Sequence, residues 1–177
     1  MKKIKTKFKN LCVFHSKSHA DTRGYFRELV LEKHVKRKLL FYVVSKSKKN
    51  VLRGLHFQKK NPQGKFLSVL KGEIFDVALD CRPNSKTFGK HFKIFLSEKN
   101  CKSIFIPPGF AHGFLGMKNE NIVMYGCTQY RNAKSESGII WNDPYLKIKW
   151  PKSKPILSTK DKNNQTFKYF FISNEKR

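Results

Sequence analysis

Long hydrophobic runs are missing from this 177-residue sequence. A membrane-spanning helix needs roughly 20 apolar residues in a row, and no stretch approaches that length. The N-terminus starts with a basic stretch, but the apolar segment that follows it, residues 11–14, is very short. A secretory signal needs about 7–15 apolar residues at this point. We therefore expect a cytoplasmic protein with no membrane partner.

Cysteine and histidine patterns typical of metal sites are also missing. The cysteines form no Cys-x-x-Cys pair, and no His-x-His sequence occurs. A zinc site or a disulfide framework needs clustered cysteines, and iron, nickel or zinc in a small β-barrel needs several converging imidazoles. The sequence therefore predicts reduced thiols and no bound metal. The cysteines are Cys12, Cys81, Cys101 and Cys127.

Acidic residues are scarce: 38 Lys and Arg stand against 12 Asp and Glu, which gives a formal net charge of +26. Such an excess fits nucleic-acid binding, a phosphorylated substrate, or a basic surface that is simply solvated. The cations are spread along the chain, and the aromatic-plus-basic motif of RNA-binding modules is absent. We therefore favour a phosphorylated small molecule and expect no nucleic-acid partner. A non-catalytic basic β-barrel that binds nucleic acid is the alternative.

The residues that are present predict one all-β domain over residues 1–177. Hydrophobic residues make up 39% and aromatic residues 14% of the chain, enough to fill a core. Short β-rich runs alternate with turn residues at intervals of roughly 8–12 residues, as in a sandwich or barrel. A weak helical pattern occurs at residues 28–38, and the C-terminal third is typical of loops with a short helix. The predicted strands are 41–44, 66–70, 74–79, 92–96, 103–106, 113–115 and 122–125.

The segment RGLHFQ, residues 53–58, points most directly to a functional site. In a regular strand, Arg53 and His56 would face opposite ways, because side chains alternate between the two faces. Taken alone, His56 is more simply explained as a hydrogen-bonded core histidine than as a catalytic base. A second histidine, His112, lies in the segment PPGFAHGF. With two histidines in such segments, a pocket that contains both is the better interpretation.

Further motifs accompany these two segments. In order they are RGLHFQ (53–58), QGK (63–65), GEIFDVA (72–78), SKTFG (85–89), IPPGFAHGF (106–114), WNDP (141–144) and LSTKD (157–161). Over residues 21–161, they resemble the motifs of the dTDP-4-dehydrorhamnose 3,5-epimerase family in order and spacing. The resemblance implies a double-stranded β-helix (a cupin-like jelly roll) with short flanking helices, a homodimer, and no metal or other cofactor. It also implies an isomerase that inverts carbons beside the ketone of a nucleotide-diphosphate-linked 4-keto-6-deoxy sugar, a precursor of cell-surface polysaccharide.

By the same resemblance, four residues carry the chemistry. A C4 ketone acidifies the protons on its neighbouring carbons, and inversion removes a proton from one face and returns one to the other. His56 is the implied base, Asp161 orients it and favours its imidazolium form, and Tyr125 is the implied acid. Lys65 would stabilise the enolate oxygen that forms as the proton leaves.

The resemblance also implies a set of substrate-binding residues. Arg53 would grip the diphosphate or the sugar with its fork of donors, and His112 would support the pocket. Gln58, at the end of the RGLHFQ motif, belongs to the same set. Arg23 and Glu28 match positions that reach the nucleotide bound by the neighbouring subunit.

Some assignments have rivals that the sequence leaves open. Tyr130 competes with Tyr125 for the role of acid, and Asp161 also resembles a residue that caps a short helix. Asp76 and Asp143 are interpreted as structural carboxylates that satisfy turns or backbone amides. The alternative function on the same fold is that of a nucleotide-sugar 3,4-ketoisomerase, which moves the ketone instead of inverting a centre.

Residues 41–45 depart from the family pattern. Members typically carry Gln-Asp-Asn-His-Ser there, whereas this chain has FYVVS and keeps only the serine. The base chemistry survives such a change, but the preference for nucleotide and sugar need not. The substrate is therefore open between a dTDP-hexulose and a GDP-linked 4-keto-6-deoxy-heptose, and inversion is open between C3, C5 or both.

Overall fold

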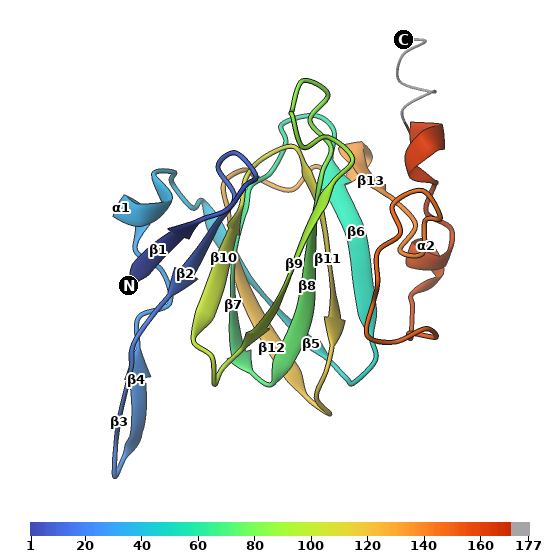
Figure 1. The fold of residues 1–177 in the computed structure, drawn as a ribbon. Helices are drawn as coiled ribbons and strands as arrows, with labels where there is room; N and C mark the ends of the chain where they lie inside the picture. The colour runs from blue at the N-terminus through green and yellow to red at the C-terminus, as the bar shows by residue number, and fades with distance from the viewer. Residues whose placement is uncertain (171–177) are drawn as a thin grey trace.

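Two antiparallel β-sheets face each other in the structure, a computed structural model that describes residues 1–170 (Figure 1). The six-stranded sheet has the order β1 (Lys2–Lys5), β2 (Cys12–His15), β10 (Lys102–Ile106), β7 (Lys65–Lys71), β12 (Asn121–Cys127) and β5 (Phe41–Ser47). The five-stranded sheet has the order β13 (Glu136–Gly138), β6 (Leu52–Gln58), β11 (Phe110–Gly116), β8 (Glu73–Asp80) and β9 (His91–Ser97). This arrangement confirms the predicted jelly roll.

The strands found from the sequence are those with a clear apolar pattern. Each predicted strand lies inside an observed one, from β5 through β12. The strands that the sequence did not reveal include β1 and the hairpin of β3 (Ser18–Asp21) and β4 (Gly24–Arg27). Their residues are mostly exposed and polar, so no alternation of buried and exposed side chains marks them.

The helix predicted over residues 28–38 is wrong in extent. Only α1 (Glu32–Val35) is helical, and Lys36 ends it in the left-handed conformation with a φ of 59°. Val35 and Leu39 are nevertheless buried against the outer face of the six-stranded sheet, so the apolar pattern reflects packing of a mostly irregular segment. Within residues 1–170, no helix is long and apolar enough to span a membrane.

Three hydrophobic clusters explain why the central strands are buried on both faces. One fills the space between the sheets, one lies between the five-stranded sheet and the C-terminal segment, and one lies between the six-stranded sheet and α1. Every residue of β11 is buried. Phe110 and Phe114 belong to the first cluster, whereas Ala111 and Leu115 belong to the second. Strand side chains at alternate positions therefore reach the interior, where the site lies.

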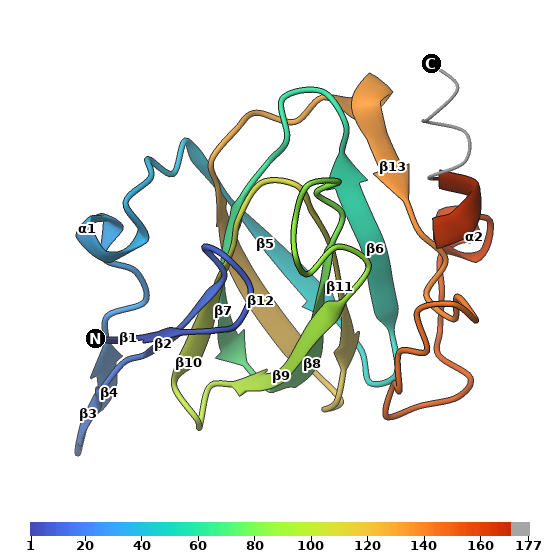
Figure 2. The same cartoon turned by 45° about the horizontal axis from the view of Figure 1, so that its top comes forward.

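The packed part of the chain extends beyond residues 21–161. Phe8 and Phe14 are buried at the N-terminal side, and Phe167 is buried at the C-terminal side. Figure 2 shows the C-terminal segment lying beside β6 and β13, whereas the β3–β4 hairpin projects away from the barrel. The outer faces of the two sheets are thus partly covered, but the hairpin is not packed into the barrel.

Candidate active site

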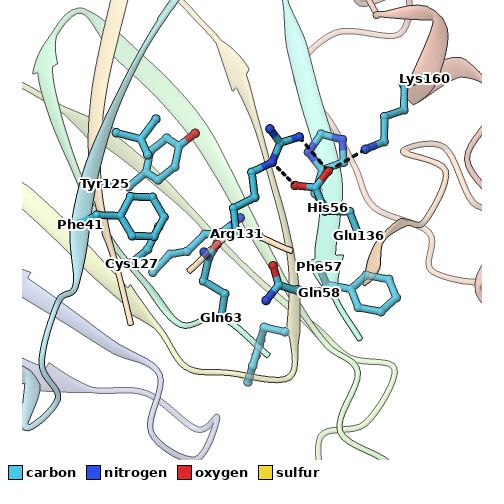
Figure 3. Close-up of a pocket in the computed structure, with 13 residues that line it drawn as sticks. Phe41, His56, Phe57, Gln58, Gln63, Tyr125, Cys127, Arg131, Glu136 and Lys160 are labelled. Atoms are coloured by element: carbon cyan, nitrogen blue, oxygen red, sulfur yellow. Dashed lines mark hydrogen bonds and ion pairs between the residues drawn. The ribbon is translucent and has the colours of Figure 1, made fainter. Parts of the chain in front are cut away.

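A cavity lies between the two sheets, and side chains from both sheets line it (Figure 3). The five-stranded sheet supplies Arg53 and His56 from β6 and His112 from β11. The six-stranded sheet supplies Lys65 from β7 and Tyr125 from β12. The fold therefore brings together residues that the sequence analysis selected from distant motifs.

His56 and Asp161 form a hydrogen-bonded pair at this cavity. His56 Nε2 lies 2.5 Å from Asp161 Oδ1, and Asp161 is only 3% exposed. Burial raises the pKa of Asp161, but the hydrogen bond and charge of His56 act the other way and hold it below its ordinary value. An ionised carboxylate facing Nε2 favours the tautomer with its hydrogen on that nitrogen, which leaves Nδ1 to accept a proton.

The competing interpretation of Asp161 as a residue of a helix cap is also partly realised. Ser158 is the N-cap of α2 (Thr159–Lys162), and its Oγ accepts a hydrogen bond from the Asp161 backbone N–H at 3.1 Å. The backbone of Asp161 thus serves the cap, while its side chain is free to pair with His56. This short helix fixes the carboxylate in place.

The prediction that Arg53 and His56 face opposite ways is wrong, because a β-bulge lies in β6 between them. On β11, His112 pairs with His56 and Phe114 pairs with Arg53, so three steps on β6 match two steps on β11. The extra residue breaks the alternation, and both Arg53 and His56 line the cavity. Gly54 permits this, because its φ is 129° and a Cβ there would lie 2.5 Å from the Cα of Gly113.

A second histidine–aspartate pair stands beside the first. His112 Nε2 lies 2.7 Å from Asp76 Oδ2, and the two residues are 7% and 0% exposed. Because His112 is the cross-strand partner of His56, the two imidazoles are neighbours. The interpretation of Asp76 as a carboxylate that satisfies turns or backbone amides is wrong. Alternation along β8 points it inward, toward the cavity histidine.

Tyr125 and Lys65 face the two histidines from the opposite sheet. Figure 3 shows the Tyr125 ring and the His56 imidazole on opposite sides of the cavity. Burial raises the pKa of the Tyr125 hydroxyl, so the phenol keeps its proton at neutral pH. Burial lowers the pKa of the Lys65 ammonium, whose Nζ lies 5.9 Å from the centre of the Tyr125 ring. A proton donor and a group that suits a developing negative charge therefore share one wall.

Three charged residues line this cavity that were not predicted as site residues from the sequence. Arg131 Nε donates to Glu136 Oε1 at 2.7 Å, and Lys160 Nζ donates to Glu136 Oε2 at 3.1 Å (Figure 3). The hydrogen bond from Arg131 and the charge of Lys160 lower the pKa of Glu136 to about 2. Lys160 had a signal, since it precedes Asp161 in the LSTKD motif, but Arg131 and Glu136 lie in a polar stretch without a pattern.

Gln58 lines the cavity, but its side-chain amide forms hydrogen bonds with backbone groups of the protein. Its Nε2 donates to the carbonyl oxygens of Asn61 and Tyr130, and its Oε1 accepts from the Asn132 N–H. These bonds hold the loop that follows β12. The expected substrate contact of Gln58 stays a prediction, and the geometry gives this residue a positioning role.

The two candidate tyrosines lie in different environments. Tyr125 lines the cavity, whereas Tyr130 is 64% exposed and stacks on Phe41, with ring centres 5.9 Å apart. Proton transfer to a bound sugar needs the donor within hydrogen-bond reach of the reacting carbon. The geometry therefore favours Tyr125 as the acid over Tyr130.

Arg23 and Glu28 do not line the cavity of their own chain in the part that the structure describes. Arg23 lies at the tip of the projecting hairpin, with its side chain 87% exposed and paired with Asp21. Glu28 is also exposed.

Asp143 satisfies backbone amides, as predicted, because it accepts from the N–H groups of Leu146 and Phe167.

Among residues 1–170, no three His, Cys, Asp or Glu side chains converge as a metal-binding group. The two histidines of the cavity are each committed to one carboxylate. Independence from metals and other cofactors stays a prediction made from the sequence.

Comparison with known proteins identifies the family of the chain. The family described as dTDP-4-dehydrorhamnose 3,5-epimerase matches residues 5–169. The chain belongs to this family. The enzyme of that name from Methanothermobacter thermautotrophicus is 42% identical over 168 residues, covering 90% of this chain and 91% of its own. The Shigella flexneri enzyme is 42% identical over 174 residues, covering 94% and 96%.

A solved structure agrees with this membership. The dTDP-6-deoxy-D-glucose-3,5-epimerase of Legionella pneumophila, in complex with dTDP-4-keto-L-rhamnose, has a TM-score of 0.89 and 38% sequence identity. The similarity covers 93% of this chain and 92% of that one. The family assignment makes the protein an epimerase, and therefore an isomerase. Residues 41–45 lie in β5, and two of them, Phe41 and Val43, line the cavity.

Proposed function

We propose that this epimerase inverts C3, C5 or both in a dTDP-linked 4-keto-6-deoxy sugar by removing and returning a proton. The observation that carries the proposal is the placement of His56 and Tyr125 on facing sheets, one on each side of a single cavity. The names of the relatives and the dTDP-sugar complex of the Legionella pneumophila enzyme support this substrate class.

In the first step, His56 Nδ1 takes the proton from the carbon beside the ketone. The electron pair of the broken C–H bond moves into the carbonyl, which becomes an enolate. Asp161 stabilises the imidazolium that results, because its ionised carboxylate lies 2.5 Å from Nε2. The Lys65 ammonium faces the same space and is suited to bind the enolate oxygen, where negative charge develops.

In the second step, the Tyr125 hydroxyl gives its proton to the opposite face of the same carbon. Its phenol is protonated at neutral pH, because burial raises its pKa above the ordinary value. The carbon is thereby inverted, and the ketone re-forms. The proton on His56 returns to solvent and Tyr125 regains one, so the cycle consumes nothing.

The diphosphate of the substrate needs cations near the sugar site. Arg53 Nε and its terminal nitrogen donate to Ser47 Oγ and the Lys46 carbonyl oxygen, which hold the guanidinium beside the cavity. Arg131 and Lys160 add two cations at the other part of the cavity wall. Glu136 pairs with both and keeps them in place until a diphosphate competes for them.

Turnover of a panel of 4-keto nucleotide sugars in deuterated water tests the function. We expect dTDP-4-keto-6-deoxyglucose to give an epimerised product with one deuteron at each inverted carbon, as read by NMR and mass spectrometry. A GDP-linked 4-keto-6-deoxy-heptose in the same panel tests the alternative substrate. A product whose ketone has moved to C3 would identify a ketoisomerase, and no reaction with any member of the panel would remove the proposal.

We also propose that the protein is a homodimer in which the β3–β4 hairpin completes the site of the partner. The hairpin pairs with neither large sheet, and an isolated two-stranded hairpin is marginally stable in water. Tyr25 and Phe26 on it are 59% and 69% exposed. As successive strand residues they lie on opposite faces of the hairpin, and exposed aromatic residues on both faces favour burial in a protein interface. Arg23 at the tip would then reach the nucleotide in the neighbouring cavity.

Light scattering and dTDP titration test this assembly. We expect the native protein at twice its chain mass of 20.8 kDa. Replacing Tyr25 and Phe26 together by Glu should give the monomer and weaken dTDP binding, because buried charge opposes the interface. Tyr145→Glu, at a position with a similar exposure of 56%, is the matched control and should stay dimeric. A native monomer with full epimerase activity would contradict the proposal.

The cellular location is proposed from the cysteines. All four are free and buried in the structure, which fits a reducing compartment such as the cytoplasm. The absence of a nucleic-acid partner stays a prediction, since the +26 charge allows non-specific contacts with phosphates.

A further inference from the structure

The part of the cavity wall that β5 supplies, beside Tyr125, is apolar. Strand β5 alternates between half-buried Phe41 and Val43, which line the cavity, and Tyr42 and Val44, which are 51% and 62% exposed. Val43 is the cross-strand partner of Tyr125. The β5 residues that line the cavity beside the proposed acid are therefore two hydrocarbon side chains.

The facing sheet brings polar and charged groups to the cavity beside apolar ones such as Phe57 and Phe110. Arg53, His56 and His112 supply charged or polar groups from the five-stranded sheet. A hydroxyl that is buried without a hydrogen-bond partner is unfavourable, and an apolar group suits such a surface. The edge of the bound sugar that lies against β5 should therefore be the edge without a hydroxyl.

The chemistry of the substrate identifies that edge. Of the two carbons that flank a C4 ketone, C3 carries a hydroxyl, whereas C5 carries C6, which is a methyl group in a 6-deoxy sugar. A carbon that receives its proton from Tyr125 must lie close to Val43, because these residues are adjacent in the sheet. C5 with its methyl fits this position without leaving a polar group unpaired.

We propose that Phe41 and Val43 seat the C6 methyl group, select 6-deoxy sugars, and place C5 in front of Tyr125. This inference rests on the proposed function, since it assumes a dTDP-linked 4-keto sugar in the cavity. It makes the two β5 residues specificity determinants of the reaction.

Binding of two stable analogues tests the proposal. dTDP-6-deoxyglucose and dTDP-glucose lack the ketone and differ only in the C6 hydroxyl, and their affinities can be measured by calorimetry. We expect the native protein to bind the 6-deoxy compound about 10–100-fold more tightly, the range in which an apolar pocket rejects an added hydroxyl.

Val43→Thr is the informative variant, because threonine has nearly the shape of valine and adds one hydroxyl. The preference for the 6-deoxy compound should shrink by about 2–10-fold, the worth of one hydrogen bond to the C6 hydroxyl. Val44→Thr makes the same change on the exposed face of the same strand and should leave the preference unaltered.

The outcomes separate this inference from the function it rests on. Native protein that binds dTDP but shows equal affinity for the two sugars would overturn the role of the β5 wall and leave the proposed function standing. An unaltered preference in Val43→Thr, with dTDP affinity and melting temperature as in the native protein, would overturn it too. Native protein that binds neither dTDP nor either sugar would overturn the proposed function itself.

Discussion

His56→Asn is expected to lower the rates of epimerisation and of solvent deuterium exchange together, by about 10²–10⁴-fold. Both processes begin with removal of the same proton, so loss of the base stops both. Asparagine keeps a polar side chain but is too short to replace Nε2, and the Asn164 amide then remains as a donor to the Asp161 carboxylate. Deuterium exchange into substrate, followed by NMR, and product formation give the two rates.

A matched control and a positioning variant sharpen this test. His15→Asn makes the same change on the exposed end of β2 and should leave both rates unaltered. Asp161→Asn should reduce kcat with dTDP affinity unchanged, because Asp161 orients the His56 ring and stabilises its imidazolium through their hydrogen bond. Exchange at the native rate in His56→Asn would assign proton removal to another group, with the neighbouring His112 as the first candidate.

Tyr125→Phe is expected to separate the two processes that His56→Asn lowers together. The enolate should still form, and return of the proton from His56 should regenerate the starting stereochemistry. Substrate recovered from deuterated water should therefore carry deuterium, while inverted product falls by about 10²–10⁴-fold. Phenylalanine keeps the ring that packs against the core, so little loss of fold is expected.

Tyr130→Phe is the control for the identity of the acid. Its ring stacks on Phe41 at the surface, and removal of its hydroxyl should leave inversion at the native rate. Native inversion in Tyr125→Phe together with loss in Tyr130→Phe would transfer the role to Tyr130. Equal loss of exchange and inversion in Tyr125→Phe, with a lowered melting temperature by circular dichroism, would indicate a structural tyrosine instead.

The elements that the sequence predicted well are the sheet strands that are rich in apolar residues. Strands such as β8 and β12 carry enough apolar residues to be found from local pattern. The helix over residues 28–38 failed because an apolar face can pack on a sheet without regular helical backbone, as Val35 and Leu39 do. Burial is a property of the packed layers, and local periodicity reports it only in part.

Local pattern also misjudged two site residues, and tertiary contacts explain both. The bulge opposite His112 turns Arg53 into the cavity, and it exists only because β6 and β11 approach closely at Gly54 and Gly113. The sequence predicts a structural role for Asp76, because nothing near it in the chain suggests a partner. Its partner His112 is 36 residues away.

The sequence by itself determined the jelly roll, the family, and the short list that contains His56, Lys65, Tyr125 and Asp161, because long motifs in fixed order carry that information. The tertiary structure decided which residues meet. It paired each histidine with its own aspartate, set Tyr125 against His56 across the cavity, and revealed the Arg131–Glu136–Lys160 cluster and the apolar β5 wall. The physical reason is that hydrogen bonds and burial depend on distances between chain segments, which linear spacing does not specify.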